Sequence, residues 1–368
     1  MPPHHLTVTK IEFFPMDLPI RDPFVVASGQ MVTTETLFVR VTLENSQSGY
    51  GEIAPFYDIS GETRESSLTV AKTLASALLG KRVDHYRQLA QTYKEMAPCN
   101  PAARCGMEMA ILDALCHSLS IPLWALWGGA DVRPHETDIT IPISDRDHTL
   151  TLARHWYQKG FRIFKIKVGR DVDQDIQRLE MLHQTLPAIQ FVVDPNQGYS
   201  RDEAVAFAEG VGCIGATILL YEQPLRREDL EGQAELRQSL NIPIAADESV
   251  RTVEDIRTIV EHQAADFVNI KIMKSGVIEA MDMALAAKSA GLRLMVGGMV
   301  ETRLAMGCSF SLVLGLGGFE ALDLDTPLLL TEDPLKGGFQ YQGATLLPWE
   351  SDGLGITLDW KKSGIILK

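Results

Sequence analysis

Two lysines stand two residues apart in the apolar segment FRIFKIKVG, at positions 165 and 167. Because side chains alternate between the two faces of a strand, Lys165 and Lys167 share one face. Two ammonium groups placed there repel each other and lose hydration, which is unfavourable without an anion nearby. One interpretation is an edge strand whose lysines reach solvent. The other is a chemical role, which depends on what the rest of the sequence places beside them.

Three carboxylates follow three other short apolar runs. Asp194 ends the run in VVDPNQG, Glu222 the run in YEQP and Asp247 the run in AADES. One such carboxylate could cap a following helix, but three in succession favour a site for Mg²⁺, which prefers oxygen ligands. Asn196 and Glu248 stand beside these residues and are candidates to orient them, with simple solvent exposure as the alternative.

The second part of the chain must position these residues, and there short apolar strands alternate with amphipathic helical patterns. Successive strands are roughly 25 to 30 residues apart, the length of one β/α unit. Eight are predicted, in TDITIPI, FRIFKIKV, IQFVVD, ATILLYE, IPIAAD, DFVNIKI, LRLMVGG and EALDLD. The pattern predicts a TIM-type (β/α)8 barrel in the α/β class. A doubly wound open sheet is the alternative, but no GxGxxG loop follows the first strand.

The first part of the chain predicts an α+β unit. Strands are expected in LTVTKIEFFPM, TLFVRVTLE and GYGEIAP as an antiparallel meander, followed by three amphipathic helices. The tail returns to short strands. The predicted organisation is an N-terminal domain (1–130), a catalytic barrel (131–330) and a C-terminal segment (331–368) that returns to the N-terminal domain and completes it.

In such a barrel the active site lies at the C-terminal ends of the strands. Lys167 on the second strand and Lys271 at the end of the sixth, in NIKIMKSG, are therefore expected to face each other across the mouth. A substrate carboxylate on the metal would have its α-carbon between them, so one lysine could remove the α-proton and the other return it. Repulsion from Lys165 is expected to lower the pKa of Lys167 toward the ~7 to 8 of lysine bases, while Lys165 stabilises the developing charge.

Composition limits the partners. The net charge of −14 and the pI of about 5.1 argue against nucleic acid and anionic membranes. The apolar stretches are too short to span a bilayer and the N-terminus has no apolar targeting segment, so a cytoplasmic location is expected. The expected partners are a small-molecule substrate, a metal ion and further copies of the chain. No CxxC pair occurs, so reduced thiols are expected at Cys99, Cys105, Cys116, Cys213 and Cys308.

The strand-end motifs together resemble those of the enolase superfamily, in the branch that includes muconate lactonizing enzymes. The motifs are KIK at 165–167, DPNQG from Asp194, YEQP around Glu222, ADES around Asp247 and NIK ending at Lys271. The resemblance covers nearly the whole chain. It implies one Mg²⁺ held by the three carboxylates, paired acid/base lysines at 167 and 271, and an N-terminal capping domain that sets substrate choice.

The eighth-strand segment DLDTP resembles the DxD motif of dipeptide epimerases, whose two carboxylates hold the substrate's α-ammonium group. Asp323 and Asp325, at i and i+2 of a strand, would share one face and suit an amine. Calcium binding or a turn is the alternative. The resemblance also implies that Thr140 on the first strand and Gly298 on the seventh contact the substrate, although both could be ordinary packing residues.

Two N-terminal segments, IRDPFVVASGQ and APFYDISGET, are expected to form the loops that set side-chain specificity. Relatives that act on Ala-Glu are expected to carry an arginine there, and the corresponding position is Gly29. Arg21 is a possible substitute, but pairing with Asp22 or exposure to water is favoured. The aromatic loop residues favour a dipeptide whose second residue is hydrophobic or aromatic. The acidic loop residue Asp58 means that a cationic second residue remains an alternative. The loop residues expected at the substrate are Phe24, Phe56, Tyr57 and Asp58.

The sequence therefore predicts a Mg²⁺-dependent isomerase that epimerises the C-terminal residue of L-Ala-L-Xaa dipeptides. Epimerases of cationic or acidic (Ala-Glu) dipeptides remain alternatives. So does an o-succinylbenzoate synthase or muconate cycloisomerase, which would use the same metal and lysines without an amine to hold. Members that use a seventh-strand histidine are disfavoured because no histidine follows His262. A non-catalytic ligand-binding barrel is a further class, against which the retained lysines and metal ligands argue.

Overall fold

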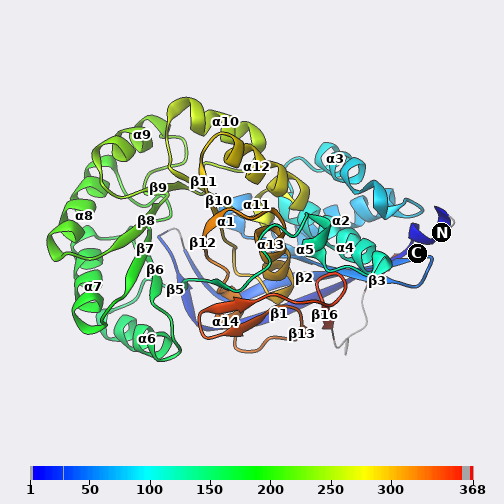
Figure 1. Cartoon of the computed structure of the whole chain (residues 1–368), viewed down its shortest axis with the longest axis horizontal. Helices are drawn as coiled ribbons and strands as arrows, with labels where there is room; N and C mark the ends of the chain where they lie inside the picture. Colours follow the sequence, from blue (N-terminus) through cyan, green and yellow to red (C-terminus); the bar gives the residue numbers. More distant parts are fainter. Residues whose placement is uncertain (1–2, 28, 359–364, 368) are drawn as a thin grey trace.

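A computed structural model describes residues 3–27, 29–358 and 365–367 of the chain. A curled parallel sheet ringed by helices lies beside an antiparallel sheet that has its own helices (Figure 1). The predicted meander is confirmed, since β1 (Val8–Val25), β2 (Gln30–Leu43) and β3 (Ser48–Ile53) pair antiparallel in sequence order. The last strand, β17 (Ile365–Leu367), pairs with β1, so the C-terminal segment returns to the first sheet.

The helices of the N-terminal part include one that is buried on all sides. This helix, α4 (Pro101–Leu119), has apolar residues all around its axis, as expected for a helix enclosed by other elements. Glycines in β3 allow it to pack very closely, because a Cβ on Gly51 would lie 2.0 Å from the carbonyl oxygen of Gly106. The other helical elements here are η1 (Pro3–Leu6), α1 (Tyr57–Ser60), α2 (Arg64–Leu78), η2 (Val83–His85), α3 (Tyr86–Met96) and α5 (Leu123–Leu126).

The eight predicted barrel strands are all present and pair in parallel, in chain order. They are β5 (Ile139–Ile141), β6 (Ile163–Lys167), β7 (Gln190–Asp194), β8 (Ile218–Glu222), β9 (Ile244–Ala246), β10 (Phe267–Ile270), β11 (Arg293–Val296) and β12 (Phe319–Leu322). Most of their residues are buried, as is usual for strands covered by helices. The first and last strands meet where the backbone N–H of Asp138 donates to the carbonyl of Leu322 at 3.0 Å. The barrel prediction is confirmed.

Helices follow the barrel strands. Six of the long helices begin at an Asp, Ser or Thr whose side chain accepts a backbone N–H of the first turn, which fixes where each helix starts. The helices are α6 (Arg146–Gln158), α7 (Val172–Thr185), α8 (Arg201–Ile214), α9 (Leu230–Ser239), α10 (Val253–His262), α11 (Ile272–Ser275), α12 (Val277–Ser289), α13 (Arg303–Leu316) and α14 (Thr326–Leu329). Short strands complete the chain: β4 (His135–Glu136), β13 (Leu335–Gly337), β14 (Gln340–Gln342), β15 (Thr345–Leu347) and β16 (Ile356–Leu358).

The expected specificity loop around residue 20 is largely a strand. Ile20–Val25 belong to the far end of β1, which with β2 forms a hairpin that reaches the barrel mouth. The backbone N–H of Ile143 donates to the carbonyl of Val25 at 2.9 Å, and Thr34 Oγ1 donates to the carbonyl of Val300 at 2.9 Å. The hairpin is therefore held against the strand ends where the catalytic residues were predicted.

Two buried carboxylates join the N-terminal part to helix ends of the barrel. Glu52 on β3 accepts hydrogen bonds from the backbone N–H of Thr302 at 3.0 Å and from Thr302 Oγ1 at 2.6 Å. Glu108 on α4 accepts from the backbone N–H of Ile278 at 3.0 Å, in the first turn of α12. Negative groups at helix N-termini are stabilising, so these contacts hold the two parts together.

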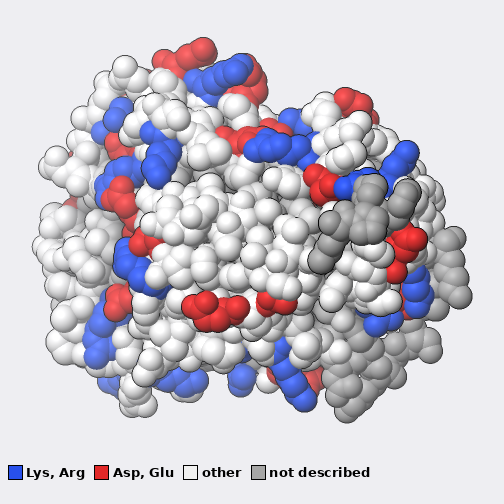
Figure 2. Space-filling model, turned by 45° about the vertical axis from the view of Figure 1, so that its right-hand side comes forward, with Lys and Arg blue, Asp and Glu red and all other residues white. Residues whose placement is uncertain are grey.

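The surface has mixed charge. In the view of Figure 2, basic and acidic side chains are interleaved around an uncharged central area. Among the described residues, no helix combines the length and apolar character needed to cross a bilayer. All five cysteines are free thiols.

Candidate active site

The strands deliver the predicted polar residues to one end of the barrel. Lys165 and Lys167 lie inside β6, and Asp194 and Glu222 are the last residues of β7 and β8. Asp247 follows β9 directly and Lys271 follows β10 directly. The six side chains are buried, although a solvated edge strand was the simpler interpretation of the first two. That interpretation is wrong, because β6 pairs with strands on both sides.

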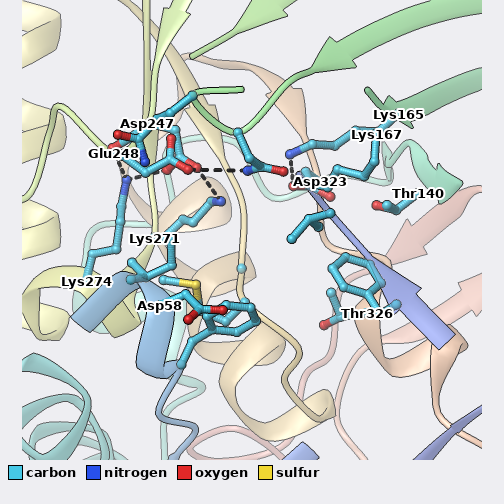
Figure 3. A pocket seen from close by; sticks show the side chains of 18 residues that line it. Asp58, Thr140, Lys165, Lys167, Asp247, Glu248, Lys271, Lys274, Asp323 and Thr326 are labelled. Carbon is cyan, nitrogen blue, oxygen red and sulfur yellow. Dashed lines mark hydrogen bonds and ion pairs between the residues drawn. The ribbon is translucent and has the colours of Figure 1, made fainter. Parts of the chain in front are cut away.

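A pocket opens at this end of the barrel, lined by both charged and apolar side chains. Figure 3 shows Lys271 on one side of it and Lys165 with Lys167 on the other. Predicted site residues that line the pocket are Phe24, Phe56, Asp58, Thr140, Lys165, Lys167, Asn196, Asp247, Glu248, Lys271, Gly298 and Asp323. The predicted residues that do not line it are Tyr57, Asp194, Glu222 and Asp325.

The lysines and the carboxylates are bonded to one another. Lys167 Nζ lies 2.6 Å from Asp194 Oδ2, and Lys271 Nζ lies 2.7 Å from Asp247 Oδ2. Burial opposes the charged form of Lys271, but Asp247, Glu222 and Asp323 together outweigh burial and raise the pKa of the lysine. Burial would raise the pKa of Asp194, but Lys167 and Lys165 hold it below its usual value.

Lys165 does not face Lys167 as an uncompensated charge. Its Nζ lies 2.7 Å from Asp323 Oδ2, 2.8 Å from Glu222 Oε2 and 3.2 Å from Asp194 Oδ2. Burial disfavours the ammonium form, but these three carboxylates raise the pKa of Lys165 well above its ordinary value. The charge of Lys165 is thus balanced by three carboxylates that come from other strands.

Asp323 and Asp325 come close together, but not as two residues of one strand. Both follow the end of β12, and Asp325 has a helical backbone conformation at the start of α14. Oxygen atoms of Asp323, Asp325 and Asp138 all lie within 4.8 Å of one another. Asp325 Oδ2 also accepts from the backbone N–H of Thr140 at 2.6 Å. Burial, followed by the Asp323 charge, raises the pKa of Asp325 to about 7.

The predicted metal ligands have the chemistry that a hard cation needs. Glu222 and Asp194 are fully buried, and Glu222 Oε2 lies 2.8 Å from Lys165 Nζ. Asn196, in a left-handed backbone conformation with φ of 45°, donates from its backbone N–H to Asp194 Oδ1 at 2.9 Å. Its Nδ2 also donates to Glu248 Oε1 at 3.3 Å. Buried carboxylates that neighbouring side chains hold in position supply the hard oxygen ligands that Mg²⁺ prefers.

The N-terminal residues predicted to contact the substrate divide into two groups. Phe24, Phe56 and Asp58 line the pocket, whereas Tyr57 points outward with 68% of its surface exposed. Tyr57 is the first residue of the short α1 and does not line this pocket, so its contact with the substrate stays a prediction. A Cβ on Gly29 would lie 3.0 Å from Asp58 Oδ2, so the hairpin and α1 meet at the pocket.

Arg21 lies away from this pocket. Its guanidinium donates to the carbonyl of Thr331 at 3.3 Å, and the predicted partner Asp22 instead lies 3.3 Å from His148. The barrel residue Gly298 does line the pocket, and a Cβ there would lie 2.3 Å from the methyl group of Met306. A side chain at position 298 would therefore collide with Met306 unless Met306 moved.

Several pocket residues were missed from the sequence. Lys274, on the short α11, lies 2.5 Å from Asp247 Oδ1 and is nearly fully buried. Its position three residues after Lys271 was the available signal. The others have ordinary residue types in loops or short helices: Val26, Ile59, Gln197, Met299 and Thr326.

Comparisons with known proteins agree over nearly the whole chain. Residues 8–128 match the mandelate racemase / muconate lactonizing enzyme N-terminal domain, and residues 148–362 match the enolase C-terminal domain-like family. An aromatic dipeptide epimerase of Herpetosiphon aurantiacus is 40% identical over 96% of this chain and 99% of its own length.

Solved structures give the same result. A mandelate racemase/muconate lactonizing protein from Herpetosiphon aurantiacus superimposes with a TM-score of 0.93 at 39% identity, covering 96% of this chain and 99% of that chain. A dipeptide epimerase from Cytophaga hutchinsonii, complexed with Mg and D-Ala-L-Val, has a TM-score of 0.93 at 27% identity, covering 98% and 99%.

Proposed function

Because the chain belongs to the mandelate racemase / muconate lactonizing enzyme family of the enolase superfamily, we propose that it is a Mg²⁺-dependent dipeptide epimerase. The reaction inverts the α-carbon of the C-terminal residue of dipeptides of the L-Ala-L-Xaa type. The aromatic dipeptide epimerase of Herpetosiphon and the dipeptide complex from Cytophaga support this substrate class.

The observation that carries the proposal is the placement of Lys167 and Lys271 on opposite sides of one pocket (Figure 3). They come from β6 and from the end of β10, which are four strands apart in a ring of eight. In the proposed reaction one lysine, in its neutral form, takes the α-proton, and the C–H electron pair moves into the carboxylate to give an enediolate. The opposite lysine, as an ammonium, donates a proton to the other face, so the configuration is inverted.

The residues proposed to hold Mg²⁺ are Asp194, Glu222 and Asp247. When bound, the ion would stabilise the negative charge that develops on the substrate carboxylate. Lys165, surrounded by Asp194, Glu222 and Asp323, supplies a second fixed positive charge at the base of the pocket. Asn196 and Glu248 are proposed to hold the Asp194 carboxylate in position. Asn196 Nδ2 donates to Asp194 Oδ2, and the same amide also donates to Glu248 Oε1.

The proposed ammonium site is formed by Asp323 and Asp325. Their carboxylates meet at one point with that of Asp138, and Asp325 Oδ1 and Asp138 Oδ1 are buried without a hydrogen-bond donor. A protonated amine could satisfy both atoms and offset the repulsion between the carboxylates. A cycloisomerase or an o-succinylbenzoate synthase would leave them unsatisfied, which favours a substrate with a free amino group.

The side chain of the second residue is proposed to be hydrophobic or aromatic. Apolar side chains from the hairpin, α1 and the loop after β11 converge on the pocket: Phe24, Val26, Phe56, Ile59 and Met299. Asp58 is the carboxylate among the pocket residues contributed by the N-terminal part, so a cationic second residue is the competing specificity. No arginine lines this pocket among the described residues, which counts against Ala-Glu.

A dipeptide library incubated with the Mg²⁺-loaded enzyme in D₂O tests the proposal. Epimerisation replaces the α-proton with deuterium, and mass spectrometry of the products detects the added mass. We expect label in L-Ala-L-Phe, L-Ala-L-Leu and similar peptides. The double variant Lys167→Met/Lys271→Met serves as the control, because it keeps the pocket but has no base. Complete absence of label across the library would rule out the epimerase.

A further inference from the structure

A second pocket lies behind the catalytic one, between the N-terminal part and the barrel. Its walls come from α1, from residues 98–104 at the start of α4, from the loop before α10 and from Lys274. Ile59 and Lys274 line both pockets, so the two share a wall. None of the described residues that line this second pocket is a carboxylate, whereas three of them are cations: Arg104, Arg251 and Lys274.

Among the residues that the structure describes, no carboxylate bonds to either arginine of this pocket. Arg104 is only 6% exposed, and its Nε is buried without a hydrogen-bond acceptor. The Nε of Arg251 is likewise buried and without an acceptor. Within the described residues, neither guanidinium forms an ion pair with a carboxylate, in contrast to Arg178, which bonds to Asp175 at 2.6 Å.

The charge of Arg104 acts on the carboxylate of Glu108, one turn further along α4. That carboxylate is occupied elsewhere, since it accepts from the backbone N–H of Ile278 at 3.0 Å. Burial, together with the charge of Arg227, lowers the pKa of Arg251 below its ordinary value. A guanidinium Nε that is buried without an acceptor is unfavourable unless something binds to it, and this applies to the buried Arg104 and to the partly buried Arg251.

The backbone adds to the positive character. Two long helices begin at the pocket, α4 with Pro101 and α10 with its N-terminal residue Thr252, and helix N-termini carry partial positive charge. Protein groups already cap both ends: Glu62 accepts from the backbone N–H of Ala102 and Asp255 from that of Thr252. The unpaired arginines, rather than the helix ends, therefore define the site.

We propose that this pocket binds a small oxyanion, in the form of a phosphate, sulfate or carboxylate group, between Arg104 and Arg251. The guanidinium groups suit such anions because they present several N–H donors in one plane. The two arginines are distinct from the residues proposed to hold Mg²⁺ and the ammonium group, and binding of a free ion would not depend on the proposed epimerase activity. The oxyanion could be a free ion or an acidic side chain of a peptide that passes Ile59 from the catalytic pocket.

Sulfate binding to the Mg²⁺-loaded enzyme, measured by calorimetry at constant ionic strength set with chloride, tests the site. Saturable binding is expected in the wild type. In Arg104→Met and in Arg251→Met the affinity should fall about tenfold or more, because each variant removes a charged hydrogen-bond donor. The matched control is Arg257→Met on α10, whose guanidinium is exposed and pairs with Glu254 at 2.9 Å. Equal affinity in all four proteins, or no saturable binding in the wild type, would overturn the proposal.

A second measurement needs no variant. Cys99 lines the pocket and Cys213 is an exposed thiol on α8, outside it. If an oxyanion occupies the pocket, sulfate should slow the reaction of Cys99 with iodoacetamide and leave Cys213 unchanged, as followed by peptide mass spectrometry. Equal rates at Cys99 with and without sulfate would contradict the site.

The two sources of the oxyanion are separated by substrate kinetics. If an acidic side chain is the ligand, Arg251→Met should raise the KM of L-Ala-L-Glu several-fold relative to that of L-Ala-L-Leu, and sulfate should compete with L-Ala-L-Glu alone. If a free ion is the ligand, the ratio of the two KM values stays the same in the variant while sulfate binding is lost. Retained sulfate binding in this variant excludes both sources.

Discussion

Lys274 Nζ lies 2.5 Å from Asp247 Oδ1, on the carboxylate oxygen opposite the one that faces Lys271. Lys274 also donates to the carbonyl of Asn269 at 3.1 Å, so it ties the end of β9 to the end of β10. A group that holds a metal ligand in one orientation contributes to metal affinity without touching the ion.

Replacing Lys274 with methionine should therefore weaken Mg²⁺ binding by about 10- to 100-fold. Methionine keeps most of the buried volume but leaves Asp247 Oδ1 without its donor. Isothermal titration of Mg²⁺ measures the effect, and Lys336→Met, on the exposed β13, is the control. An unchanged affinity in Lys274→Met would mean that Asp247 is held by Lys271 and the backbone alone.

The two proposed bases should be separable by stereochemistry. Lys271→Met should lose exchange of the α-proton from one stereoisomer by about 10²- to 10⁴-fold and retain more exchange from the other, with Lys167→Met showing the opposite pattern. Deuterium incorporation into L-Ala-L-Phe and L-Ala-D-Phe, measured separately in each variant, checks this. Equal exchange from both stereoisomers in either variant would be incompatible with two bases on opposite faces.

Removing the proposed ammonium site should affect substrates with a free amine most, although Asp323 also contacts Lys165. Asp323→Asn should raise the KM of L-Ala-L-Phe about tenfold or more, because a charged hydrogen bond is lost. An N-acetylated dipeptide, which has no ammonium group, should already react poorly and lose little further. The ratio of kcat/KM for the two substrates in the variant and the wild type is the measurement. Asp202→Asn, in the first turn of α8, is the control.

Asp58 decides between two specificities. Its carboxylate is exposed at the pocket rim, and an ion pair in such a position is worth ~0.2–1 kcal/mol. Asp58→Asn should change kcat/KM for L-Ala-L-Phe by less than about twofold and reduce that for L-Ala-L-Lys by about two- to fivefold. A larger loss with L-Ala-L-Phe would place Asp58 in contact with every substrate.

Glu108 should make the stability of the protein depend on pH. Burial raises its pKa from 4.5 to about 7, so between these values the folded chain holds a proton that the unfolded chain releases. Its contribution to stability is thus complete below about pH 4.5 and is lost as the pH rises through about 7. Between about pH 5 and about pH 8 the free energy of unfolding should fall by roughly 2 to 3 kcal/mol more in the wild type than in Glu108→Gln. Urea unfolding of both proteins at the two pH values measures this difference.

The barrel could be predicted from the sequence because each of its strands is an apolar run bounded by turn residues. The functional residues at the strand ends could be predicted for the same reason. Asp194, Glu222 and Lys271 are charged residues that interrupt or end apolar runs, where strand formation alone does not require a charge. The ring order then determined which residues face one another. These inferences use only local pattern and the known geometry of a barrel.

What the sequence did not reveal depends on contacts between distant segments. The sequence places Lys165 beside the like charge of Lys167, but in the structure the charge of Lys165 is balanced by Asp323, 158 residues away. The aromatic side chain of Tyr57 suggested a contact with the substrate, but the direction in which that side chain points depends on the single turn of α1. The cations of the second pocket lie on α4, on the loop before α10 and on α11, and no local pattern relates them.

The hairpin of β1 and β2 has a consequence for how such a protein can change over generations. It brings Phe24 and Val26 to the pocket, whereas the lysines and carboxylates come from the barrel, more than a hundred residues later. Substitutions near the hairpin tip can therefore alter which peptide is accepted while the proton-transfer residues stay the same. Such a division of labour lets new specificities arise by small steps, without an inactive intermediate between one substrate and the next.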